Sequence, residues 1–337
     1  MHQTFWNSRT NNRQITLTYR WLLLGLLVFS VGCPSGSSSL QTQLDEVVEA
    51  GDSGADAERD AVVTATRELQ IATFNVKRFF DTICDSGSCG GRSYEALPDE
   101  AEFSRRAEEL AEAIVGLDAD VVLLQEIESE VCLEAINSKV TDRYSVSVFG
   151  EVGYAASLDV GVLSRGELRE VRRHRPIGLT RPDGSETRFS REFLEVHLNI
   201  DGGYVVVFNA HFKSKANDDP GRRFAEAAAA HKIVLNSAAE LPRALVVFGG
   251  DLNDTPGSEP LNAIEEGGKL FRVGSELESD WTFADFRGTA AIDHLYLALP
   301  AEGRHVSGSA EVFRDGRGAW GGSDHAAHGA RFLVPLP

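Results

Sequence analysis

Short apolar runs that stop at a polar or turn-forming side chain recur along the chain from residue 69 onward. Runs of this length, bounded by polar or Gly residues, are typical of buried β-strands. One of them, 143–150, alternates apolar and polar positions, which predicts a strand with one solvated face. The predicted strands span 69–76, 120–128, 143–150, 158–165, 191–199, 204–211, 244–254, 291–299 and 321–336.

Two segments between these strands carry helical patterns instead. Asp99 followed by Glu102 predicts a capping box at the start of the first helix, and Gly116 suits its end. The alanine- and leucine-rich segment 222–240 predicts the second helix. The apolar side chains that mark the first helix at helical spacing are Phe103, Ala107, Leu110, Ala111, Ile114 and Val115.

The first 33 residues have the features of an export signal. Three arginines precede a short apolar run that ends at Cys33, and this run is too short to span a bilayer as a mature helix. The residues "SVGC" resemble a bacterial lipobox, although Ser30 stands where Leu is usual, and an ordinary cleaved signal is the alternative. We therefore expect an exported protein, either a lipoprotein of the bacterial cell envelope or an extracellular protein. We expect contact with a membrane only through an N-terminal lipid.

Residues 34–68 consist mainly of Ser, Gly, Ala and acidic residues, with almost no aromatic side chains. Such a segment cannot bury enough apolar area to offset the entropy of ordering it, so we predict a disordered tether. The folded domain is then 69–337. The whole chain contains 42% hydrophobic residues, which is ample for a sizeable core.

The net charge of −18 limits the ways in which this protein could bind nucleic acid. Broad neutralisation of phosphates requires a basic surface, so tight binding of this kind is disfavoured, whereas catalysis on phosphates is not. The domain holds three cysteines, Cys84, Cys89 and Cys132, of which two could pair after export. The spacing does not determine which two.

The polar side chains that end the predicted strands share a chemical character. Asp and Asn form turns, and one such ending is commonplace. Six endings drawn only from Asn, Asp, Glu and His point to strand ends that meet in one site. The residues concerned are Asn75, Glu126, His211, Asp251 with Asn253, Asp293, and Asp324 with His325.

This set of side chains restricts the chemistry. No GxSxG nucleophile motif and no glycine-rich phosphate loop ending in Lys-Ser/Thr occurs in the sequence. Ligands that are mostly oxygen favour a hard cation such as Mg²⁺, Mn²⁺ or Ca²⁺. A hard cation together with a general base suits attack of water on phosphorus.

The motifs "FNV", "LLQEIE", "HFKSK", "GGDLND" and "SDHAAHGARF" together resemble the endonuclease/exonuclease/phosphatase superfamily. Its members include DNase I-like nucleases, apurinic endonucleases, bacterial sphingomyelinases and inositol polyphosphate phosphatases. The motifs follow the family's order and span essentially all of 69–337. The resemblance implies an α+β fold, a four-layer α/β/β/α sandwich with two mixed β-sheets.

The resemblance also implies roles for individual residues. Asn75, Glu126 and Asp324 resemble the residues that hold the metal. His211 resembles the histidine that contacts the scissile phosphate. Asp159 resembles, through a looser match, the acid that orients this histidine.

The remaining roles concern the attacking water and the phosphate. Asp251 and Asn253 resemble the pair that positions the water and a phosphoryl oxygen. His325 resembles the general base, which must be neutral before it acts, and Asp293 resembles the carboxylate that orients it. Arg191 resembles a phosphate-contacting arginine of DNase I-like members, although Phe193 stands where these members usually have Pro.

Three functions remain open at this point. The segment "NAHFKSK" and the basic helix after it resemble secreted bacterial nuclease domains, so we expect an exported, non-specific nuclease that hydrolyses DNA, with RNA as a second candidate substrate. A phospholipid or phosphosugar phosphodiesterase is the alternative, against which stands the lack of a long aromatic-tipped hairpin. A non-catalytic surface binding module is disfavoured by the full set of catalytic-type residues.

No protein partner is evident. Four cations, which we expect to guide a polyanion, are Lys213, Lys215, Arg222 and Arg223.

Overall fold

The structure is a computed structural model that describes residues 65–140, 142–277, 279–315 and 319–337. The predicted export signal and nearly all of the predicted tether lie outside the described residues. The first strand begins at Thr66, three residues before the predicted domain boundary. The backbone N–H of Leu336 donates to Ala65 O at 2.8 Å, which ties the start of the described chain to its end.

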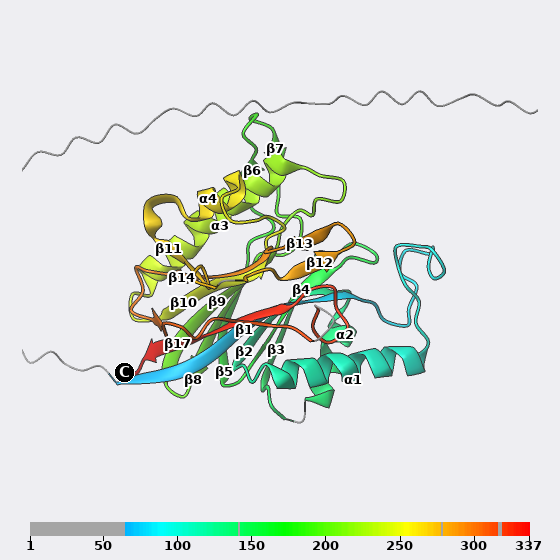
Figure 1. Ribbon diagram of the computed structural model, residues 1–337, viewed down its shortest axis with the longest axis horizontal. Helices are drawn as coiled ribbons and strands as arrows, with labels where there is room; N and C mark the ends of the chain where they lie inside the picture. The colour runs from blue at the N-terminus through cyan, green and yellow to red at the C-terminus, as the bar shows by residue number, and fades with distance from the viewer. Residues whose placement is uncertain (1–64, 141, 278, 316–318) are drawn as a thin grey trace, which may run out of the picture. The chain divides into compact units, whose positions relative to one another are not determined.

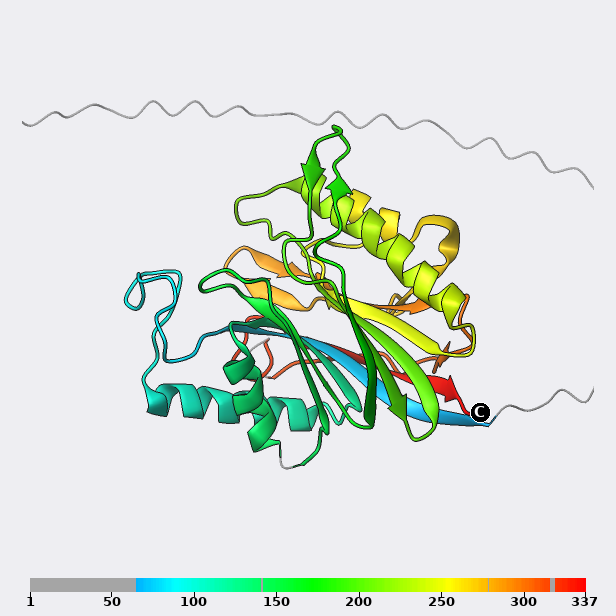
Figure 2. The same ribbon diagram turned by 180° about the vertical axis from the view of Figure 1, so that it is seen from behind.

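Two mixed β-sheets form the centre of the molecule (Figures 1 and 2). The first sheet has seven strands, in the order β15 (Arg304–His305), β17 (Ala327–Pro335), β1 (Thr66–Phe79), β2 (Val121–Ile127), β4 (Asp159–Ser164) and β3 (Val146–Gly150), with β16 (Glu311–Phe313) also paired to β17. The second has six, in the order β11 (Leu270–Val273), β14 (Asp293–Ala298), β10 (Leu245–Asp251), β9 (Gly203–His211), β8 (Leu194–Ile200) and β5 (Glu167–Arg173). Parallel pairs β1–β2 and β9–β10 make both sheets mixed.

Helices cover the outer faces of the two sheets. In Figure 1, α1 and α2 lie against the first sheet, and α3 and α4 lie beyond the second. The structure thus confirms the predicted four-layer sandwich. The helices and short elements are α1 (Glu100–Gly116), α2 (Glu130–Lys139), α3 (Pro220–Glu240), α4 (Glu259–Ile264), a 3₁₀ turn (Glu266–Gly268), and the hairpins β6 (Leu179–Thr180) with β7 (Glu186–Thr187) and β12 (Phe283–Asp285) with β13 (Gly288–Ala290).

Helix α1 begins as its sequence predicts. The Asp99 side chain accepts the N–H of Glu102, and the Glu102 side chain accepts the N–H of Asp99, so the capping box is complete. No helix among the described residues is long and apolar enough to cross a membrane.

Alternation along the strands decides which residues can reach the space between the sheets. In β1, Leu69 and Ile71 join the core between the two sheets, whereas Ala72 and Phe74 join the core under α1 and α2. Successive side chains of a strand point to opposite faces. Residues on the Ile71 face therefore look toward the second sheet.

Candidate active site

Three predicted site residues stand side by side in the second sheet. Asp251, the last residue of β10, pairs with His211 on β9 and with Asp293 on β14. The glycines before Asp251 allow this close register, because Gly250 has φ +141° and a Cβ there would overlap Ala210 O. The sequence "GGD" thus places a carboxylate where three strands meet.

The first sheet supplies two more site residues from the facing side. Asn75 Nδ2 donates to Asp251 Oδ2 at 3.0 Å and to Glu126 Oε1 at 3.2 Å. Glu126 has a positive φ of 67°, at an irregularity where the pairing of β2 shifts register. This is an unfavourable backbone conformation for a Glu residue, and such conformations persist where the surroundings impose them. The Arg78 backbone N–H donates to Glu126 Oε2 at 2.8 Å and helps to hold it.

His325 completes the centre from the loop before β17. Its Nδ1 lies 2.8 Å from Asp293 Oδ2, and its Nε2 lies 4.0 Å from Asp251 Oδ2. The Ser323 hydroxyl accepts the N–H of His325 at 3.0 Å and donates to Asn75 O at 2.8 Å, which links this loop to β1.

The charges around His325 keep it protonated. Burial lowers the pKa of His325, but the charge and hydrogen bond of Asp293, together with the charges of Asp251 and Glu126, raise it to about 10. Three carboxylates thus face one imidazole, and their charges favour the imidazolium, whereas the general base has to be neutral before it acts. A neutral His325 therefore stays a prediction for the protein with its cation.

The same crowding affects Asp251 and indicates that the residues suit a cation. Burial, together with the charges of Asp293 and Glu126, raises the pKa of Asp251 to about 7 against the opposing charge of His325. Ligand atoms of Glu126, His211 and Asp251 lie within 4.8 Å of one another. Oxygen-rich ligands and excess negative charge fit a hard divalent cation.

His211 is nearly fully buried beside this group. Its Nε2 lies 3.5 Å from Asp251 Oδ2. Burial lowers its pKa well below the usual value, and the charges of Arg191 and His325 lower it further, so His211 is neutral. Its Nδ1 has no hydrogen-bond partner among the described residues.

No hydrogen bond joins Asp159 to His211 among the described residues, and the expected role of Asp159 stays a prediction. Asp159 Oδ2 accepts instead from Ser157 Oγ at 2.8 Å and from the Val152 N–H at 3.2 Å. Alternation along β4 explains the difference. Asp159 and Leu163 are four residues apart and so lie on the same face of β4. Leu163 packs under α2, whereas Val160 and Val162 lie on the opposite face, toward the second sheet.

Arg191 and Asn253 lie next to His211, although neither touches Asp251 with its side chain. Asn253 Nδ2 and Arg191 Nη1 both donate to Phe212 O, at 3.3 and 3.4 Å. The Asn253 backbone N–H donates to Asp251 Oδ1 at 2.9 Å. Arg191 forms no ion pair with any described residue, which leaves most of its N–H donors free.

Asp324 occupies a different position from the one expected of a metal ligand. Its Oδ2 pairs with Lys77 Nζ at 3.2 Å, and its side chain is one-third exposed. Among the described residues, the groups of converging ligand atoms include Glu126 and Asp251 but not Asp324. The lysine thus compensates Asp324, and Asp251 stands closer to Glu126 in its place.

The four cations of the predicted basic patch each bind groups of the protein itself. Arg223 is buried and pairs with Asp254 at 2.7 Å and Asp218 at 2.8 Å. Lys215 also pairs with Asp254, at 3.0 Å. Lys213 donates to two backbone carbonyls, and Arg222 donates to Arg188 O. All four cations thus contact neighbouring acids or carbonyls, and the guidance of a polyanion by them stays a prediction.

A buried polar layer lies beneath the centre, and its residues were not among those predicted from the sequence. Gln125 Nε2 donates to Asn209 Oδ1 at 2.8 Å and to Thr73 Oγ1 at 3.0 Å. Asn209 Nδ2 in turn donates to Leu124 O and Gly161 O, at 2.9 and 2.8 Å. Thr73 and Asn209 precede site residues by two positions on their strands, and this period-2 spacing was the available signal. The layer fixes the spacing of the two sheets under the site.

The fold and the site together define a class of protein: a two-sheet sandwich whose strand ends collect carboxylates, amides and histidines. The chain belongs to the endonuclease/exonuclease/phosphatase family, whose model matches residues 72–325. Members of this family generally hydrolyse phosphodiester bonds. No curated protein matches the chain.

Solved structures share the fold at low sequence identity. An endonuclease/exonuclease/phosphatase from Bacteroides vulgatus superposes with a TM-score of 0.57 at 16% identity, covering 80% of this chain and 99% of its own. D. rerio TDP2 complexed with a single-strand DNA product gives 0.55 at 18% identity, covering 79% and 98%. Sphingomyelinase C from Streptomyces griseocarneus gives 0.54 at 18% identity, covering 80% and 100%.

Proposed function

We propose that this protein is an exported, divalent-metal-dependent phosphodiesterase that hydrolyses nucleic acid without sequence preference. The observation that carries the proposal is the convergence of polar groups from both sheets on Asp251. Its Oδ2 lies 3.0 Å from Asn75 Nδ2, 3.5 Å from His211 Nε2 and 4.0 Å from His325 Nε2. A buried arrangement of this kind has a function in proton transfer and charge stabilisation.

Each side chain then has a role in the proposed hydrolysis. Asp251 and the neighbouring Asn253 orient the attacking water. His211 donates a hydrogen bond to a phosphoryl oxygen. Asp293 engages Nδ1 of His325, and Nε2, once it has lost the proton that the carboxylates hold on the ring, is the atom that takes the proton from the water.

The metal would be held mainly by Glu126 and Asp251, with Asn75 beside them. Mg²⁺ is our first choice, with Mn²⁺ and Ca²⁺ as alternatives. Such an ion supplies positive charge to the phosphoryl oxygens. Asp324 remains a proposed ligand, provided that it leaves its ion pair with Lys77.

Two observations support nucleic acid as the substrate. Arg191 has no ion-pair partner among the described residues and lies beside His211, where its planar fork suits a phosphate. D. rerio TDP2, which shares the fold, forms a complex with a single-strand DNA product.

One observation favours a phospholipid as the second candidate. The turn between β12 and β13 carries Phe286, which is 93% exposed, so a short aromatic-tipped hairpin is present after all. It lies close to the site, because Phe283 of this hairpin packs on His325 with ring centroids 4.9 Å apart. Sphingomyelinase C is also among the proteins of similar structure.

The proposed export rests on residues 1–33 and gains support from the cysteines. Cys84 and Cys89 form a disulfide, and Cys132 is free and buried. Disulfides persist mainly in oxidising compartments. Mass spectrometry of the native protein tests the proposal. Processing near Cys33, with a lipid mass, is expected, and an unprocessed cytosolic chain contradicts it.

The activity is tested on plasmid DNA, RNA, sphingomyelin and bis-p-nitrophenyl phosphate, each with Mg²⁺, Mn²⁺, Ca²⁺ or EDTA. We expect cation-dependent cleavage of DNA, which is lost in His325→Ala. Preferential turnover of sphingomyelin supports the second candidate. If no substrate is hydrolysed by protein that circular dichroism shows to be folded, both the nuclease and the phospholipid candidates are overturned. A non-catalytic binding module is then the remaining candidate.

A further inference from the structure

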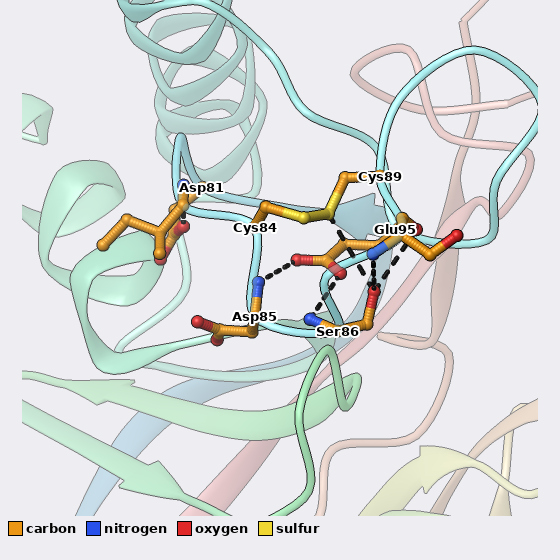
Figure 3. The surroundings of a disulfide bond; sticks show 8 residues. Asp81, Cys84, Asp85, Ser86, Cys89 and Glu95 are labelled. Atoms are coloured by element: carbon orange, nitrogen blue, oxygen red, sulfur yellow. Dashed lines mark hydrogen bonds between the residues drawn. A yellow bond between two sulfur atoms is a disulfide. The ribbon is translucent and has the colours of Figure 1, made fainter.

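Residues 80–98, here called the disulfide loop, connect β1 to α1 and are held by several contacts. Figure 3 shows Glu95 reaching across the loop beside the Cys84–Cys89 disulfide. The buried Glu95 carboxylate accepts the N–H groups of Asp85 and Ser86, at 2.6 and 2.9 Å. At the start of the loop, the Asp81 N–H donates to Glu128 Oε2 at 2.7 Å. The loop is therefore preformed despite its lack of regular structure.

The disulfide loop encloses a pocket next to the proposed catalytic centre. The pocket measures about 540 Å³, which falls in the range of small-molecule sites. Two of its lining residues contact site residues directly: Lys77 pairs with Asp324, and the Arg78 N–H donates to Glu126. The lining includes Lys77, Arg78, Phe80, Gly90, Gly91 and Leu97.

Arg78 and Phe80, which line the pocket, form a cluster with Tyr94, which lies outside the pocket lining. The Arg78 guanidinium lies 4.7 Å from the ring centroid of Tyr94 and 5.7 Å from that of Phe80. The two rings meet edge to face, 5.8 Å apart. Arg78 Nη2 donates to Tyr94 O, and Arg78 forms no ion pair with a described carboxylate. Most of its N–H donors are thus free to bind an anion.

Tyr94 offers an open aromatic surface close to the catalytic groups. The residue is 56% exposed. Partial burial raises the pKa of Tyr94. The charges of Arg191 and Arg78 oppose this rise, and the charges of Glu126 and Asp159 add to it. The hydroxyl thus lies within the field of the charges that surround the proposed site. An exposed ring beside unpaired guanidinium groups is the combination with which proteins bind single-stranded nucleic acid.

We propose that the pocket at the disulfide loop, together with the exposed ring of Tyr94 that adjoins its lining residues Arg78 and Phe80, is a subsite for the nucleotide next to the scissile phosphate, with the base stacked on Tyr94 and the phosphate bound by Arg78. This rests on the proposed function and specifies its substrate as single-stranded or locally unpaired nucleic acid. Stacking needs an unpaired base, because the faces of paired bases are covered by their neighbours. The subsite also gives an acidic domain a local means of holding a polyanion.

The test compares two fluorescent strands with equal numbers of phosphates, oligo(dT) and a strand of abasic deoxyribose. Binding to the full chain is measured by anisotropy at low ionic strength in EDTA, so that no cleavage is required. We expect wild-type protein to bind oligo(dT) roughly 5- to 150-fold more tightly, which is the range for stacking of one base. Tyr94→Ala should remove most of this preference, and Tyr94→Phe should keep it.

Two further variants separate the base from the phosphate. Arg78→Gln should weaken both strands alike, because both keep their phosphates. Phe271→Ala removes a ring of similar exposure, 40%, from edge strand β11 and should leave the preference unchanged. Circular dichroism confirms that each variant is folded.

The outcomes distinguish this inference from the proposed function. Equal binding of both strands by wild-type protein, or a preference that survives Tyr94→Ala, overturns the subsite even if DNA is cleaved. A preference that depends on Tyr94 supports the subsite even if no phosphodiester is hydrolysed with any metal, and in that case the proposed function alone fails.

Discussion

Replacing Asp293 by Asn tests whether one carboxylate holds the proton on His325. The two side chains are buried, and Nδ1 and Oδ2 lie 2.8 Å apart. The pKa of His325 stands at about 10, raised from 6.5 although burial lowers it. At about 1.4 kcal/mol per pKa unit, this net rise corresponds to roughly 5 kcal/mol in favour of the imidazolium, by which the attraction of Asp293, Asp251 and Glu126 exceeds the cost of burial.

In Asp293→Asn the nearest of these charges is gone, while burial still disfavours the imidazolium. We therefore expect the pKa of His325 to fall by about two units or more. The assay is an ¹⁵N NMR titration of the His325 imidazole in metal-free protein. With Mg²⁺ added, the wild-type pKa should also fall, because the cation opposes the same carboxylate charges. An Asp293→Asn titration that matches the wild type refutes the reasoning.

The same pair makes stability depend on pH with a defined sign. A histidine whose pKa is raised by folding adds stability that is complete below its unfolded pKa, near 6.5, and is lost as the pH rises through its folded pKa, about 10. The loss of unfolding free energy in Asp293→Asn should therefore be largest near pH 6 and shrink toward pH 10. Urea unfolding at both pH values measures it, and a loss that grows with pH contradicts the assignment.

Turnover provides an independent check on the pair. His325→Ala should lower kcat on DNA by about 10²–10⁴-fold, the usual span for a positioned general base. Adding Asp293→Asn should cost little more, because the two side chains act as one unit. Fully additive losses, or a His325→Ala enzyme near the wild-type rate, would show that another residue is the base, with His211 the next candidate.

Three other predictions follow from single contacts. Glu126→Gln should abolish most metal-dependent activity and weaken Mg²⁺ binding in calorimetry, and unchanged binding would exclude Glu126 as a ligand. Arg223→Met leaves the buried Asp254 without its guanidinium and should lower the free energy of unfolding by about 3–5 kcal/mol, whereas Lys213→Met should lower it by less than about 1 kcal/mol. Glu95→Gln should speed hydrogen exchange at the backbone N–H groups of Asp85 and Ser86, which donate to the Glu95 carboxylate. Unaltered exchange would show that the disulfide alone holds the loop.

Local patterns in the sequence determined most of the secondary structure and the identity of the site. Apolar runs marked the long strands, and the capping box at Asp99 marked the start of α1, because these features depend on neighbouring residues. The same patterns missed β5, the exposed strand at 167–173, whose charged residues show no buried face. They also missed α2, whose buried face consists of only three residues, too few to mark a helical period.

Relations between distant strands were decided only by the tertiary structure. Sequence proximity could not show that Arg223 is buried against Asp254, or that Lys77 compensates Asp324. It could not show either that Asp159 accepts hydrogen bonds from Ser157 and Val152 rather than from His211. The residue types at a strand end follow from the sequence, whereas their partners follow from sheet register and from the facing of two sheets, which bring together residues as far apart as Asn75 and Asp251.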